Sequence, residues 1–178
     1  DLLLGRDNRG DEGIEQRNEP GNQLGGIDWR LSGTFFGDTG VGLYSQWIGE
    51  DESGGTPSRF SMLIGADASI ILTGIHHRIY LEFSDTTAEG FKGGDSARPN
   101  ISYEHSIYKN GYRYRIRSIA SATDNDTRML TLAHDLHLND DQQISWSLAK
   151  VEVNRDGTDT SPPGGNTLSR NVRTNLWL

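Results

Sequence analysis

Residues 59–83 read RFSMLIGADASIILTGIHHRIYLEF, two alternating stretches separated by a Thr-Gly pair. Before the pair, apolar side chains occupy even positions from Phe60 to Ile70; after it, they occupy odd positions from Ile75 to Phe83. A period of two is typical of a β-strand with one apolar and one polar face. The tight connection at residues 72–74 therefore predicts two consecutive strands with a short turn between them.

The rest of the chain repeats this pattern. We expect ten strands, which begin at Asp1, Gly26, Val41, Arg59, Ile75, Ile101, Tyr112, Arg128, Gln142 and Asn171. The expected long connections are residues 6–25, 50–58, 85–100, 121–127 and 154–170; the expected tight ones are residues 37–40, 72–74, 109–111 and 139–141. Strands of about 9–12 residues, with tight turns at one end and long loops at the other, are typical of an outer-membrane barrel. The sequence therefore predicts an all-β fold, an antiparallel transmembrane β-barrel.

Composition narrows the function classes. The chain has 178 residues, 33% of them hydrophobic, no Cys and a net charge of −8. No run approaches the ~20 apolar residues of a membrane helix, whereas a barrel needs an apolar residue only at every second position. We expect no nucleic-acid partner, because such binding depends on neutralising phosphates. The chain starts at Asp1 with no visible signal peptide, and we expect a mature or excised segment.

The Asn110-Gly111 pair predicts a two-residue type I′ turn between the expected strands at Ile101 and Tyr112. This register places Glu104 opposite Arg117 and sets Arg113, Arg115 and Arg117 in a row on the polar, lumen-facing side. Three guanidinium groups in a row could bind an acidic glycan by bidentate contacts. The alternative is that the row pairs with lumen carboxylates and fixes the register of the strands.

Several stretches resemble the capsule-assembly Wzi family. They are NEPGNQLGGIDWR at residues 18–30, YEHSIYKNGYRYR at 103–115, and shorter stretches at 49–52, 82–87, 124–128 and 153–156. The resemblance implies a porin-sized outer-membrane barrel of which residues 1–178 are the C-terminal part, about ten strands, without the N-terminal helical part and early strands. It also implies a lectin-like protein of the bacterial outer membrane that anchors exported capsular polysaccharide to the cell surface. We expect a monomeric barrel in contact with outer-membrane lipid.

The candidate polysaccharide-binding residues fall into two groups. The lumen candidates are Arg113, Arg115, Arg117, Glu104, Arg78 and Glu82, and the loop candidates are Asp124, Asp126, Arg155 and Asp156. Each of them could instead serve the structure, as an ion pair of the barrel interior or as part of a solvated turn.

We expect no enzyme, no cofactor and no metal site. The chain lacks the G-x-S-x-G and H-E-x-x-H motifs, and the adjacent His76 and His77 should point to opposite faces of a strand. Two alternatives to the anchoring function remain open at this point. They are a porin-like passive channel and a soluble β-sandwich carbohydrate-binding module.

Overall fold

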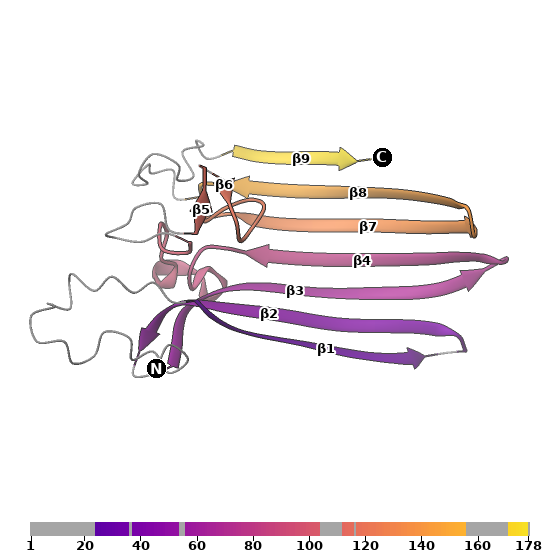
Figure 1. The fold of residues 1–178 in the computed structure, drawn as a ribbon, viewed down its shortest axis with the longest axis horizontal. Coiled ribbons are helices and arrows are strands. Elements are labelled where there is room, and N and C mark those ends of the chain that lie inside the picture. Colours follow the sequence, from indigo (N-terminus) through magenta and orange to yellow (C-terminus); the bar gives the residue numbers. More distant parts are fainter. Residues whose placement is uncertain are drawn as a thin grey trace, which may run out of the picture.

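The computed structural model describes residues 24–35, 37–53, 56–103, 112–115, 117–155 and 171–177. Seven strands form one antiparallel sheet in the order β1-β2-β3-β4-β7-β8-β9 (Figure 1). Their bounds are β1 Gly25–Phe35, β2 Thr39–Ser53, β3 Thr56–Leu72, β4 Ile75–Asp85, β7 Arg128–Asn139, β8 Gln142–Val153 and β9 Asn171–Trp177. Strands β1 and β9 are the two edges of this sheet, which does not close on itself within the described residues.

The two ends of the sheet are unequal. At the tight-turn end, β1 is followed by β2 after residues 36–38, β3 by β4 after residues 73–74, and β7 by β8 after residues 140–141. At the opposite end, which we call the loop end, residues 86–127 connect β4 to β7 and residues 154–170 connect β8 to β9. The expected long loop at residues 50–58 is wrong, because β2 and β3 keep pairing there through Asp51↔Ser58 and Ser53↔Thr56.

The apolar side of the sheet, here called the outward face, has no second layer over its central band in the described part of the chain; at the loop end, the Phe91 ring packs edge-on against the outward-facing Trp47, with ring centres 5.0 Å apart. Cross-strand partners share a face, and Ala66, Leu81, Leu132 and Leu148 follow one another across β3, β4, β7 and β8. Leu81 is 50% exposed, and most of the large apolar side chains around it are also exposed. This is the arrangement of a lipid-facing barrel wall, whereas a soluble β-sandwich would seal these residues between two sheets.

Two of the expected strands are wrong. Strand β4 pairs directly with β7, from Asp85↔Arg128 to His76↔His137, so no strand from Ile101 or Tyr112 can lie between them. The connection instead contains two single turns of 3₁₀ helix, η3 Gly90–Lys92 and η4 Gly94–Ser96, and a small sheet of β5 Arg113–Tyr114 and β6 Arg117–Ser118. A turn signal and a short alternation are local, so they do not distinguish a barrel hairpin from a hairpin inside a loop. The expected strand at Asp1 and the Asn110-Gly111 turn lie outside the described residues.

No helix in the described ranges is long and apolar enough to cross a membrane.

Candidate functional site

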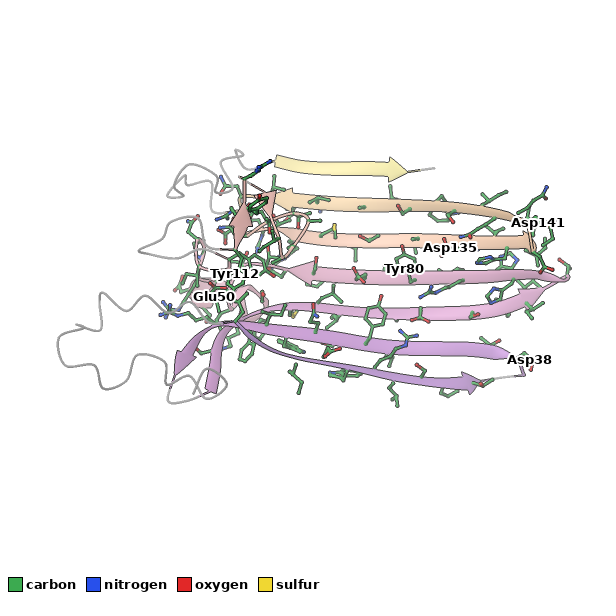
Figure 2. The ribbon with its side chains drawn as sticks, viewed as in Figure 1. Asp38, Glu50, Tyr80, Tyr112, Asp135 and Asp141 are labelled. Carbon is green, nitrogen blue, oxygen red and sulfur yellow. The ribbon has the colours of Figure 1, made fainter. Side chains whose placement is uncertain are left out.

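The connection between β4 and β7 packs against the inner, polar face of the sheet at the loop end, and we call it the loop-end cap. The inner-face residues beneath it are buried, among them Ser61, Ser84, Val151 and Val153. The cap binds the sheet directly, since the Tyr103 backbone N–H donates to Glu50 Oε2 over 3.0 Å. Figure 2 shows Glu50 and Tyr112 together at this end of the sheet. A long connection packed in this way covers the inner face of the sheet at the loop end.

Two distant sequence stretches meet at the base of the cap. The Thr86 N–H donates to the Thr127 carbonyl over 2.9 Å, and the Thr127 N–H donates back to Thr86 Oγ1 over 3.0 Å. The Thr86 hydroxyl also donates to the Asp124 carbonyl over 2.7 Å. Asn125, Asp126 and Thr127 are among the most deeply buried residues of the described chain. Hydrogen bonds within the cap hold these residues in place: the Thr127 hydroxyl donates to the Thr123 carbonyl over 2.8 Å, and Asn125 Nδ2 donates to Asp126 Oδ2 over 3.3 Å.

Asp85 joins a third stretch to this base. Its carboxylate is 1% exposed, accepts hydrogen bonds from Arg128 Nη2 over 2.7 Å and Arg155 Nη1 over 3.4 Å, and also accepts from the Thr87 N–H over 3.0 Å. A carboxylate buried this deeply requires such partners. The loop candidate Arg155 is therefore engaged in holding the ends of β4, β7 and β8 together.

The expected row of three arginines does not form. The Arg113 side chain is 1% exposed and forms a bidentate ion pair with Asp124. Nη2 donates to Oδ1 over 2.8 Å, and Nε donates to Oδ2 over 3.0 Å. Arg115 lies at the turn between β5 and β6 with a φ of 47°, and its guanidinium is stacked over the exposed Tyr114 ring at 5.4 Å. Arg117 belongs to β6. The alternation that predicted the row is interrupted by this turn after Tyr114.

The remaining predicted site residues lie apart from one another. Asp126 is buried and accepts a hydrogen bond from the Asn100 N–H over 2.7 Å, so it stabilises the cap. Arg78 is exposed on the inner face of β4, where Ser69 and Asp135 are its cross-strand partners. Glu104 and Asp156 lie outside the described residues.

Glu82 takes part in an inner-face network that the sequence did not reveal. The Tyr44 hydroxyl donates to Glu82 Oε2 over 3.1 Å, and Arg30 forms an ion pair with Asp67 at 2.7 Å. The Arg30 guanidinium also lies 5.4 Å from the centre of the Tyr44 ring. The Tyr44 ring covers Gly65, where an added Cβ would clash with the ring. Tyr44 lies on the inner face, directly opposite Arg30 on β1 and Gly65 on β3, which allows these contacts.

A search with family models matches residues 1–177 to the family described as Capsule assembly protein Wzi. The chain belongs to this family. Among solved structures it is similar to Wzi of Escherichia coli, described as an outer membrane protein involved in group 1 capsule assembly and as a carbohydrate binding β-barrel. The two are 28% identical with a TM-score of 0.66, and the match covers 84% of this chain and 32% of that chain. No curated protein gave a significant match.

Family membership and the barrel match confirm the predicted family, the antiparallel all-β barrel class and the outer-membrane location. The chain spans about a third of the length of the solved barrel, since the match covers 32% of it. The division of residues 1–178 as the C-terminal part of one domain stays a prediction.

The pKa values of three cap residues, Tyr103, Tyr112 and Glu89, differ from their ordinary values. Burial raises the pKa of Tyr103 above its ordinary value, and the charge of Glu50 adds to this. Burial and the charge of Glu50 also raise the pKa of Tyr112. For Glu89, burial pushes the pKa upward, but hydrogen bonds from Lys92 and the Phe60 N–H outweigh it and hold the pKa below its usual value. The cap is therefore built around neutral phenols and paired carboxylates at neutral pH.

The surface of the cap presents groups that suit a sugar. Tyr114 is 65% exposed, and the guanidinium of Arg115 above it is also exposed. An aromatic ring stacks on the apolar face of a sugar, and a guanidinium binds a carboxylate or hydroxyls. Tyr114 was not selected from the sequence, because the expected strand register placed it on the lipid-facing side.

His76 and His77 lie on opposite faces of β4 as predicted, with Ser69 and His134 as their respective partners. Among the described residues, no three metal-ligating side chains come together.

Proposed function

We propose that the chain binds capsular polysaccharide without covalent attachment and helps to hold the exported capsule at the cell surface. The observation that carries the proposal is the loop-end cap, which presents an exposed aromatic–guanidinium pair, Tyr114 and Arg115, on a buried polar framework. The described activity of the Escherichia coli relative, carbohydrate binding, supports it.

The chemistry of binding follows from this division between framework and surface. The buried Arg113–Asp124 pair fixes the segment that carries Tyr114 and Arg115, so little conformational freedom is lost when a glycan binds. The Tyr114 ring supplies a stacking surface, and the Arg115 guanidinium can form bidentate bonds with a uronic acid or other anionic sugar. We propose binding without turnover, by a monomeric barrel whose outward face contacts outer-membrane lipid.

A passive channel is the second candidate function, and the polar inner face of the sheet favours it. Arg30, Asp67, Tyr80 and Asp135 all lie on this face, as a water-filled lumen would require. The cap weighs against an open channel because it covers the inner face at the loop end. The conductance of the full-length protein in planar bilayers distinguishes the two, since a retained capsule needs no steady ion current.

Capsule retention in a deletion strain tests the proposal. The strain is complemented with the full-length protein, with its Tyr114→Ala/Arg115→Ser variant, or with Asp141→Ala, a control at the exposed tight-turn end. Loss of one stacked ring is worth about 1 kcal/mol or more, so we expect at least fivefold weaker binding of purified capsular oligosaccharide. The double variant should release capsule into the medium while the control retains it. Equal retention by both, with normal amounts of assembled protein, would refute the proposed surface.

A further inference from the structure

A group of charged side chains lies on the outward face at the loop end of β4, β7 and β8. Register places Asp85, Arg128 and Glu152 side by side across the three strands, directly beyond the apolar band. Their interactions define the group, which we call the rim cluster: Asp85, Arg128, Lys150, Glu152 and Arg155. Asp85, Arg128 and Arg155 stabilise the base of the cap, whereas Lys150 and its ion pair with Glu152 have no part in it among the contacts of the described residues.

Lys150 is the clearest sign of a second role. It is directly opposite Leu130 and two residues from Leu148, both exposed on the outward face. The Lys150 side chain is 56% exposed and forms an ion pair with Glu152 at 3.4 Å. A cation on a lipid-facing strand is costly unless its long stem carries the charge to the headgroup layer. Lys150 therefore marks the level at which hydrocarbon gives way to lipid headgroups.

The accessible charge of the rim cluster is positive. It contains two carboxylates, but Asp85 is 1% exposed and is covered by the two arginines that bind it. A molecule that approaches from the lipid side meets Lys150, Arg128, Arg155 and one partly exposed carboxylate, that of Glu152. The Arg128 guanidinium lies 5.7 Å from the centre of the Phe83 ring, at the edge of the apolar band nearest the loop end. At the same level of β2 and β3 the outward positions hold the uncharged Trp47 and Met62; Lys92 of the cap lies over the Phe91 ring that packs on Trp47, but it is paired with Glu89.

We propose that the rim cluster binds the phosphorylated headgroup of a lipid in the outer leaflet. Arginine forks suit phosphate oxygens, and a lysine adds a compact charge. The acyl chains of the same lipid would lie along Leu130, Leu132 and Leu148, which continue the outward face below the cations. The site faces the membrane and is thus distinct from the glycan-binding surface on the cap. Because Arg128 and Arg155 also hold Asp85, a bound lipid would contact the framework on which the cap rests.

Lipid binding to the purified full-length protein tests this proposal. Native mass spectrometry in detergent would measure binding of lipid A with its two phosphates, of the same glycolipid without phosphate, and of inorganic phosphate alone. One lysine near a charged lipid surface is worth about 1 kcal/mol, so Lys150→Gln should weaken binding of the phosphorylated lipid about fivefold. Glu152→Gln removes the accessible carboxylate and should tighten it. Lys150→Arg should restore binding.

Arg78→Gln is the matched control, because it removes one positive charge from the inner face of the same sheet. It should leave lipid binding unchanged. The proposal is overturned if Lys150→Gln binds the phosphorylated lipid as tightly as the parent, or if Arg78→Gln weakens it equally. Equal binding of the phosphate-free glycolipid by the parent would also overturn it. Binding of inorganic phosphate with no preference for the lipid would show an anion site without a lipid role, and would overturn it too.

Discussion

Removal of the Arg113 guanidinium should loosen the loop-end cap. The side chain is 1% exposed and bonds both carboxylate oxygens of Asp124 at 2.8 and 3.0 Å. The Arg113→Gln variant keeps a polar side chain but removes the charge and the bidentate contact with Asp124. Arg115→Gln is the control, because this neighbouring arginine is exposed and stacks only on Tyr114 among the described contacts.

The magnitude follows from the burial of the pair. Loss of one partner of a buried ion pair costs about 3–5 kcal/mol, because the other charge is left without compensation. The Asp124 side chain is 19% exposed and can recover some hydration, so we take the lower limit of about 3 kcal/mol. If that energy is lost from the closed cap, its population of open states rises by about a hundredfold.

Hydrogen exchange on the full-length protein measures this opening. The reporters are the Tyr112 amide, which donates to the Tyr103 carbonyl over 3.0 Å, and the Ile119 amide, which donates to the Tyr112 carbonyl over 3.0 Å. Both should exchange about a hundredfold faster in Arg113→Gln and at the parental rate in Arg115→Gln. Bilayer conductance should rise in the same variant if the cap obstructs the lumen. If both amides exchange at the parental rate in Arg113→Gln, the Arg113–Asp124 pair does not hold the cap closed.

Three further predictions concern the sheet and the cap. Leu132→Arg puts a charge on the outward face, and we expect assembly in lipid to lose about 2–4 kcal/mol, whereas Ser145→Arg on the inner face should assemble normally. Heat-modifiable gel shifts measure assembly, and equal assembly of both variants would contradict the face assignment. Gly65→Ala would bring a Cβ into the Tyr44 ring, and we expect about 1–3 kcal/mol of lost stability in urea unfolding; an unchanged midpoint would mean that the ring does not pack there. Burial raises the pKa of Tyr103 above 10.0, so its contribution to cap stability is complete below pH 10 and is lost as the pH rises through the higher folded value. The protection of cap amides, measured against the intrinsic base-catalysed exchange rate, should fall in that alkaline range, and Tyr103→Phe should leave only the part of the fall that Tyr112 contributes, since its pKa is raised as well; a fall of parental size would assign the titration to another group.

The barrel wall could be predicted from the sequence because successive residues of a strand point to opposite faces, so the apolar face appears as every second residue. The stretch from Phe60 to Phe83 gave the right strands, the right turn and the right outward face. The unequal ends followed as well, although β2 and β3 extend further than expected because residues with loop-like composition continue to pair near Ser53 and Thr56. Alternation and turn chemistry are local properties, and these elements depend on little else.

The cap could not be predicted in the same way because its contacts are non-local. Arg113 is two residues from Arg115, but one is buried against Asp124 and the other is exposed at a turn. Periodicity assigns both to one face, and only the direct pairing of β4 with β7 removes the strand that would have carried them. Likewise, nothing in the spacing of Asp85 and Arg155 indicates that they form an ion pair.

The positions of the cap contacts bear on where binding specificity lies. The sequence stretches at 82–87, 124–128 and 153–156, through which the chain resembles its family, converge on the base of the cap at Asp85, Thr86, Thr127 and Arg155. These residues are occupied by one another, so they fix the shape of the cap more than they touch a ligand. Under the proposed function, a glycan would instead contact the exposed segments that this base supports, such as Tyr114 and Arg115. Exchange of those exposed segments between relatives should therefore transfer polysaccharide preference, whereas exchange of the base alone should alter stability and leave preference unchanged.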